Sequence, residues 1–131
     1  MKKEKINMKI TTEDRGWAGH FFMSDRCNFR RNTLVSYGDK HIVVSTVGDC
    51  RVDGKPIEIG HHRYYETMMF WSQLELELYL DADITKKIVF TGDWSVSKLD
   101  KESDKEANTM HENAVIWAKE NIKSLKVPKG E

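Results

Sequence analysis

Cysteine is scarce in this sequence, with only Cys27 and Cys50 among 131 residues. Two cysteines make neither a disulfide framework nor a zinc ligand set, so we expect a reduced protein in the cytoplasm. Arg26 stands beside Cys27, and a nearby cation lowers a thiol pKa. Because no candidate base is placed near it, we interpret Cys27 as a small buried hydrophobic residue rather than a nucleophile.

Long apolar runs are also missing, since Glu, Asp or Lys interrupts the hydrophobic stretches. Crossing a bilayer takes about 20 consecutive apolar residues, so we expect no membrane association. The charged segment 1–10 is not followed by an apolar one, so we do not expect a secretory signal. The length predicts a single domain, residues 1–131, in which residues 1–14 are a lead-in segment.

An excess of either charge is absent, because 21 Lys and Arg balance 21 Asp and Glu. A neutral protein is poorly suited to holding long nucleic acid, which we do not expect as a partner. The charges are segregated, however. Residues 15–34 carry four arginines and a single acid, whereas residues 66–83 carry five acids and no Lys or Arg. The basic segment could form a local positive site, or the two segments could pair across a sheet or between subunits.

The common catalytic and nucleotide-binding motifs are missing too, since there is no GxSxG sequence, no P-loop and no Rossmann glycine set. None of the five histidines has a spacing that positions metal ligands by local geometry. His61 and His62 are adjacent, so on a strand they would point to opposite faces. Asp81 and Asp83 would share a strand face, although a solvated turn is the commoner role for such a pair. We therefore expect no catalytic residue, no metal and no cofactor.

What the sequence does contain is a series of strand patterns. Residues 30–37 and 41–47 flank a Gly38–Lys40 turn and predict a hairpin. Both faces of 41–47 are mostly apolar, so this strand is expected to be central and covered on each side. Residues 48–60 contain three glycines and a proline and predict a loop.

Further strands are predicted over 61–71, 72–80 and 86–90, with leucines alternating with polar residues in 72–80. The period then changes, because apolar residues fall three or four apart beyond Ser103. The stripe consists of Ala107, Met110, Ala114, Trp117, Ala118 and Leu125. Ser103 and Glu106 match a capping box, so we predict a helix over 104–125 whose apolar face packs on the sheet or on a partner subunit. The predicted fold class is α+β, a mainly antiparallel sheet of about five to six strands with one long C-terminal helix.

The stretch from Arg15 to Thr33 is the strongest candidate for function. It holds four of the six arginines, one of the four tryptophans and three of the five phenylalanines. Guanidinium forks beside aromatic rings are what proteins use to hold phosphates and stack bases. If residues 26–31 are extended, Arg26, Asn28 and Arg30 share one face and could hold a diphosphate, with Arg31 on the other face. Alternatively, Arg26 and Arg30 pair across strands with Glu66 or Glu75.

A second segment, Arg63 to Tyr65, repeats the combination of a cation with aromatic rings. His20 could donate a hydrogen bond to a phosphate or ribose oxygen. The complete set of candidate ligand-binding residues is Trp17, His20, Phe21, Arg26, Asn28, Arg30, Arg31, Arg63, Tyr64 and Tyr65.

Five blocks in order carry a resemblance to a known family: RGWAGHF (15–21), DRCNFRRNT (25–33), VVSTVG (43–48), RYYETM (63–68) and MHE (110–112). Over residues 15–120 the chain resembles small proteins of bacteriophages and prophages, with the type one Thoeris anti-defence sponge family as the best match. The longer N-terminus and the 48–60 segment depart from the family pattern.

The resemblance implies a non-enzymatic protein in the cytoplasm of an infected or lysogenic bacterium. Such proteins sequester cyclic ADP-ribose-type signals made by a host TIR-domain protein; related members hold cyclic oligonucleotides, and they assemble as dimers or higher homo-oligomers. Two other functions stay open. One is a small phosphodiesterase or hydrolase that uses His20 or His111 as acid or base, and the other is an inhibitor that docks a host protein through the arginine face and the helix around Trp117.

Overall fold

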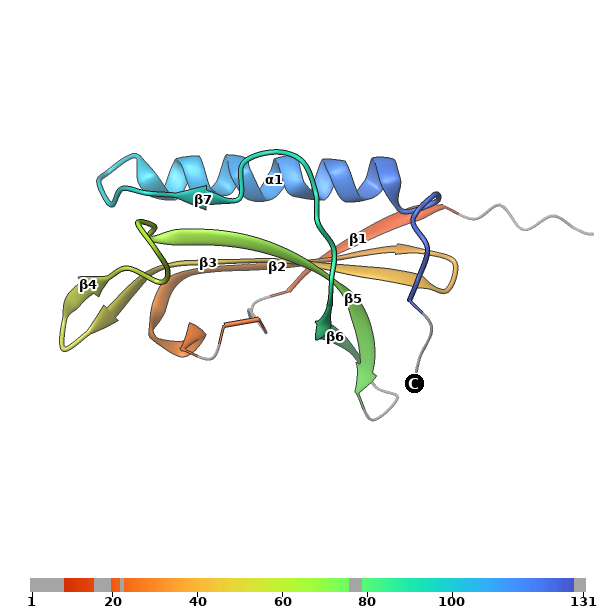
Figure 1. The fold of residues 1–131 in the computed structure, drawn as a ribbon, viewed down its shortest axis with the longest axis horizontal. Coiled ribbons are helices and arrows are strands. Elements are labelled where there is room, and N and C mark those ends of the chain that lie inside the picture. The colour runs from red at the N-terminus through yellow and green to blue at the C-terminus, as the bar shows by residue number, and fades with distance from the viewer. Residues whose placement is uncertain (1–8, 16–19, 22, 76–78, 129–131) are drawn as a thin grey trace, which may run out of the picture.

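An antiparallel sheet with one long helix across a single face forms the protein (Figure 1). The computed structural model describes residues 9–15, 20–21, 23–75 and 79–128. Its elements are β1 (Ile10–Arg15), the 3-10 turn η1 (Ser24–Arg26), β2 (Cys27–Tyr37), β3 (Lys40–Val52), β4 (Lys55–Ile57), β5 (Tyr65–Glu75), β6 (Tyr79–Lys87), β7 (Ser95–Val96) and α1 (Ser103–Asn121). The α+β class, the mainly antiparallel sheet and the C-terminal helix are confirmed. None of the described helices is long and apolar enough to cross a bilayer.

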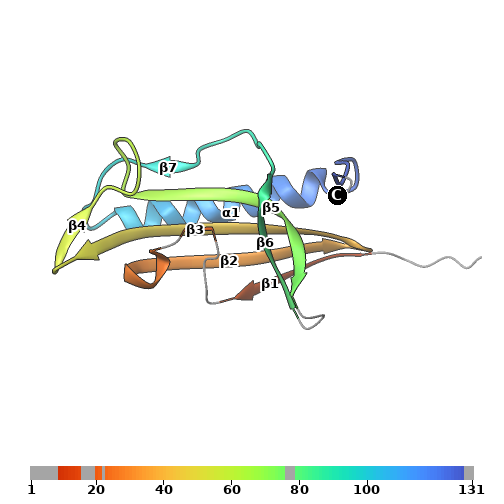
Figure 2. The same ribbon diagram turned by 60° about the horizontal axis from the view of Figure 1, so that its bottom comes forward.

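The sheet has the order β1-β2-β3-β5-β6, with β4 paired to β3 and β7 paired to β5. The predicted hairpin is β2–β3, which turns at Gly38 with a φ of 59°. Strand β3 lies between β2 and β5 and is buried from Ile42 to Gly48, as its two apolar faces predicted. The pairing of β5 with β6 is irregular between Phe70 and Ser72, and beyond that point both strands bend away from α1 (Figures 1 and 2).

The loop predicted over residues 48–60 is wrong. Gly48 to Val52 continues β3, and β4 folds back on it through a turn at Asp53 and Gly54, both with positive φ. An Asp-Gly pair occurs both in the tight turn of a hairpin and in longer loops, so composition alone does not distinguish a hairpin from a loop. The division of 61–80 was also wrong, because one strand, β5, runs across it from Tyr65 to Glu75. The separate strand predicted over 86–90 is not formed, since residues 86 and 87 are the end of β6 and residues 88–90 lie outside any strand.

The helix packs its small side chains on the sheet, as its period predicted. Ala107, Ala114 and Ala118 are buried at 0–2 % exposure, which allows a close approach to β2, β3 and β5. Its start differs from the expected capping box, because Glu102 is the N-cap and makes no side-chain cap hydrogen bond. The Ser103 hydroxyl instead donates to the Lys98 carbonyl at 3.0 Å and accepts from the Asp100 amide at 2.8 Å, so it stabilises the preceding turn.

The two cysteines differ from the reduced state expected of them. Cys27 and Cys50 are cross-strand partners of β2 and β3 and form a disulfide bond. Both are buried in a small cluster with Val47 and the partly buried Phe21, so the expectation of a buried Cys27 holds. A disulfide is uncommon in the cytoplasm, and the expected location therefore stays a prediction.

Candidate ligand-binding site

The arginine-rich end of β2 extends past its neighbour. Strand β1 pairs with β2 only from Asn32 to Tyr37, so the preceding residues of β2 have β3 on one side and no described strand on the other. Asn28 and Arg30 are exposed on this end, and Arg26 is exposed in η1 just before it. Within the described part of the chain, neither Arg26 nor Arg30 forms an ion pair. Two permanent positive charges are therefore open to solvent at one end of the sheet.

Two carboxylates border this arginine end: Asp25 is exposed directly before Arg26 in η1, and Asp49 lies beside Asn28. Asn28 Nδ2 donates to Asp49 Oδ2 at 3.2 Å, and Arg51 Nε donates to the other oxygen of Asp49 at 2.7 Å. Asp49 is thus neutralised by its own partner, Arg51, and does not take up the charge of Arg26 or Arg30.

Arg31 lies on the opposite face, as strand alternation predicted. Its guanidinium pairs with Asp14 at 3.1 Å and with Glu112 of α1 at 2.6 Å. These bonds hold the helix against β1 and β2, so Arg31 acts in the fold.

The pairing of Arg30 with Glu66, which was the alternative to ligand binding, is not formed. Arg30, Val47 and Glu66 do lie in one row across three strands, which places Arg30 about 10 Å from Glu66 at the usual strand spacing. The Glu66 carboxylate, however, accepts from His20 Nε2 at 3.0 Å and from Arg63 Nε at 3.0 Å. Burial raises the pKa of Glu66, but the hydrogen bonds and charges of His20 and Arg63 outweigh burial and keep that pKa below its ordinary value.

His20 links this carboxylate to a serine. Its Nδ1 lies 2.6 Å from Ser45 Oγ, and its Nε2 lies 3.0 Å from the Glu66 carboxylate. In the neutral tautomer that donates from Nε2 to Glu66, Nδ1 accepts the Ser45 hydroxyl proton, whereas the charged ring donates from both nitrogens. The order hydroxyl, imidazole, carboxylate is that of an activated nucleophile. Ser45 is 0 % exposed, however, and the His20 side chain is 3 % exposed. As it stands, the serine is closed to a substrate.

The described tyrosines among the candidate residues pack within the fold. The Tyr65 ring lies against Gly48, where an added Cβ would come within 2.0 Å of it. Its hydroxyl donates to Asp104 at 2.5 Å, and burial together with this bond raises the pKa of Tyr65. Tyr64 is partly buried and packs against the apolar cluster that contains Tyr65 and Phe29. Trp17 lies outside the described residues. Arg63 stacks on Trp94, with its guanidinium carbon 4.8 Å from the ring centroid.

Two further corrections concern histidines. His61 and His62 lie in a turn, not on a strand, and their rings are 3.8 Å apart. His111 of α1 lies between Thr33 and Thr46 at 2.8 and 2.7 Å, and it is completely buried. Thr33 donates its own proton to Asp14, so His111 donates from Nε2 to Thr33 and accepts from Thr46 at Nδ1. Burial lowers the pKa of His111 to about 3.

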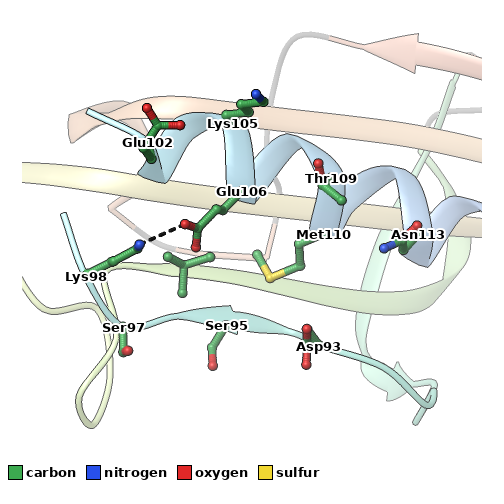
Figure 3. A pocket seen from close by; sticks show the side chains of 11 residues that line it. Asp93, Ser95, Ser97, Lys98, Glu102, Lys105, Glu106, Thr109, Met110 and Asn113 are labelled. Carbon is green, nitrogen blue, oxygen red and sulfur yellow. Dashed lines mark ion pairs between the residues drawn. The ribbon is translucent and has the colours of Figure 1, made fainter. Parts of the chain in front are cut away.

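Two grooves are hollowed into the described surface, and sequence reasoning found neither. The larger, about 500 Å³, lies between β7 and the first half of α1 (Figure 3). Val96 and Met110 line it together with polar side chains that include Asp93, Glu102 and Glu106, and an ion pair joins Lys98 to Glu106 at 2.8 Å. The smaller, about 190 Å³, lies beside Trp94. A strand as short as β7 leaves no periodic pattern, which is why the larger groove was missed. The smaller groove depends on the packing of the stretch after β6 beside β5, which no local pattern shows.

Nine of the ten predicted residues are described, and the structure places several of them in two groups. The structure brings together Arg26, Asn28 and Arg30 at one end of β2, and His20 with Arg63 at Glu66. In the described part of the chain, no three His, Cys, Asp or Glu side chains come close enough to hold a metal ion. Comparisons with protein-family models, with curated proteins and with solved structures find no match.

Proposed function

We propose that this protein is a non-enzymatic phage anti-defence protein that binds and sequesters a cyclic ADP-ribose-type or cyclic oligonucleotide immune signal. It acts as a homo-oligomer in the cytoplasm of the bacterial host. The sequence blocks described above suggest this class, and one structural observation carries the binding claim. Arg26 and Arg30 are exposed at the end of β2 and form no ion pair with any described residue.

The arginine end suits a diphosphate. Each charge-assisted hydrogen bond from a guanidinium contributes on the order of 1.5–3 kcal/mol. Arg30 stands on a strand held by β3, so its backbone is fixed before the ligand arrives, and Asn28 beside it adds an amide donor. Sequestration needs tight binding without turnover, and the burial of Ser45 beneath His20 is consistent with that requirement.

The test is a calorimetric titration of the protein with cyclic ADP-ribose. The double variant Arg26→Gln/Arg30→Gln is expected to bind at least about tenfold more weakly, because two charge-assisted contacts are lost. Lys119→Gln/Lys126→Gln is the matched control, since it also removes two positive charges, from exposed side chains at and beyond the last turn of α1. Equal affinity of the double variant and the control would refute the arginine site.

The second candidate is hydrolysis, and it is favoured by the Ser45–His20–Glu66 arrangement. Hydrolysis would require a conformational change that exposes the Ser45 hydroxyl, because a nucleophile must reach the reacting atom of the substrate. Analysis of the ligand after the titration separates the two functions. A sponge returns the ligand intact, whereas a hydrolase returns cleaved product in amounts that grow with time.

A further inference from the structure

The smaller groove has an aromatic wall that is held in place. The Arg63 guanidinium covers part of the Trp94 indole and is itself fixed by Glu66 at 3.0 Å. Gly60 also packs on Arg63, since an added Cβ would come within 2.2 Å of the guanidinium carbon. The Trp94 carbonyl accepts from the Thr67 amide at 2.8 Å, which ties this residue to β5. The indole is therefore oriented from one side, yet it is 43 % exposed.

The smaller groove is bounded by this indole. It is formed by β5, by the stretch after β6 and by Trp94, and Arg63 is not part of its wall. Its lining residues are Thr67, Met68, Lys87, Ile88, Val89, Phe90 and Trp94. In Figure 1 this stretch rises from β6 toward the level of α1 before it reaches β7. About 190 Å³ is below the range of roughly 300–1,000 Å³ for drug-sized ligands, and it has room for one flat ring system.

The charges of the two grooves differ. Lys87 is the only charged residue that lines the smaller groove, and within the described part of the chain it makes no ion pair. The larger groove is lined by three carboxylates and by two lysines, Lys98 and Lys105, and Lys98 already pairs with Glu106 at 2.8 Å. Its net charge is therefore negative, which disfavours an anion. The smaller groove thus combines an aromatic face, apolar side chains and one available cation.

We propose that the groove beside Trp94 binds a purine base, which stacks on the indole while its phosphate lies toward Lys87. An oriented aromatic ring accepts a base through its π face, and an ammonium group attracts the phosphate as a point charge. The inference deepens the proposed function, on which it rests for the identity of the ligand, because it names the surface that would take one base of a cyclic oligonucleotide signal. Such a ligand has several phosphates, so one phosphate at Lys87 is separate from those assigned to Arg26 and Arg30.

The test is a chemical-shift titration with AMP, followed at the Trp94 indole N–H and the Met68 methyl group. Trp94→Ala is expected to weaken AMP binding at least about fivefold, the lower limit for one base stacked on an aromatic ring, and Trp94→Phe should restore part of it. Val89→Asp places a carboxylate in the groove at a side chain that is 83 % exposed, so it should weaken AMP binding without disturbing the fold. Ile116→Ala, at a half-exposed hydrophobic residue of α1, is the matched control and should change nothing.

Pyrophosphate, which has no base, separates this inference from the proposed function. If pyrophosphate fails to bind while AMP shifts Trp94 and Met68, the arginine site is wrong and the base groove stands. If pyrophosphate binds but millimolar AMP leaves both signals unmoved, or if Trp94→Ala and Val89→Asp bind AMP as the wild type does, the base groove is wrong.

Discussion

At the scale of single residues, the two buried histidines show what sequence reasoning could and could not find. His20 was singled out because it lies among arginines and aromatics, and the structure places it at Glu66 with Arg63, another candidate. His111 drew attention only as a possible acid or base. Its role in joining α1 to two strands depends on Thr33 and Thr46, which are 78 and 65 positions away, so no local pattern could reveal it.

His111 makes the stability of the fold depend on pH. Its pKa is about 3 in the folded protein and about 6.5 in the unfolded chain, so the unfolded state binds more protons between these values. Stability is therefore fully present above pH 6.5 and is lost as the pH falls toward 3. At 1.36 kcal/mol per pH unit, lowering the pH from 7 to 5 should reduce the free energy of unfolding by about 2 kcal/mol.

Urea denaturation at a series of pH values measures this effect. His111→Gln should be less stable at pH 7. Its free energy of unfolding should also depend much less on pH between 6.5 and 4 than that of the wild type. Part of the dependence will remain, because burial also lowers the pKa of His41, which destabilises the fold in the same direction. Asp14, with its lowered pKa, acts only at still lower pH. His62→Gln, at an exposed turn, should keep the wild-type slope. An unchanged slope in His111→Gln would show that this residue does not carry the acid sensitivity.

At the scale of elements, the helix and the strands with a strong local period were predicted correctly, whereas pairings between short, distant strands were not. The β2–β3 hairpin and α1 have a strong local period, and both were predicted within a few residues. The extension of β3 into a second hairpin with β4 was missed because its partner strand is only three residues long. Strand β7 is shorter still, and its place depends on two residues of β5.

The disulfide between β2 and β3 is also an element-scale feature. Cys27 and Cys50 are 23 positions apart, and closing a loop of about this size in the unfolded chain contributes about 3 kcal/mol of stability. The double variant Cys27→Ala/Cys50→Ala should therefore unfold at a lower urea concentration than the wild type, and a reducing agent should destabilise the wild type alone. Two free thiols in the purified wild type, together with no effect of reduction, would contradict this expectation.

At the scale of the whole molecule, the two faces of the sheet have different tasks. Helix α1 covers one face with an apolar interface and with the His111 and Arg31 contacts. Arg26 and Arg30 remain open at one end of β2, and the Trp94 groove lies at the edge beyond β5. The sequence pointed to the arginines because guanidinium groups are suited to binding anions, and that role stays a prediction. The sequence could not show which arginines form ion pairs within the fold and which are exposed without one, since that depends on where Asp14, Glu112 and Glu66 lie in the fold.

The central claim is that the open arginines hold an anionic nucleotide signal without breaking a bond. The most direct measurement is mass spectrometry of the small molecules released when the purified protein is denatured, after its expression beside an active signalling system. We predict that the wild type and Lys119→Gln/Lys126→Gln release an intact cyclic nucleotide in stoichiometric amount, and that Arg26→Gln/Arg30→Gln releases little or none. Cleaved product from the wild type, or equal release from all three proteins, would contradict the account.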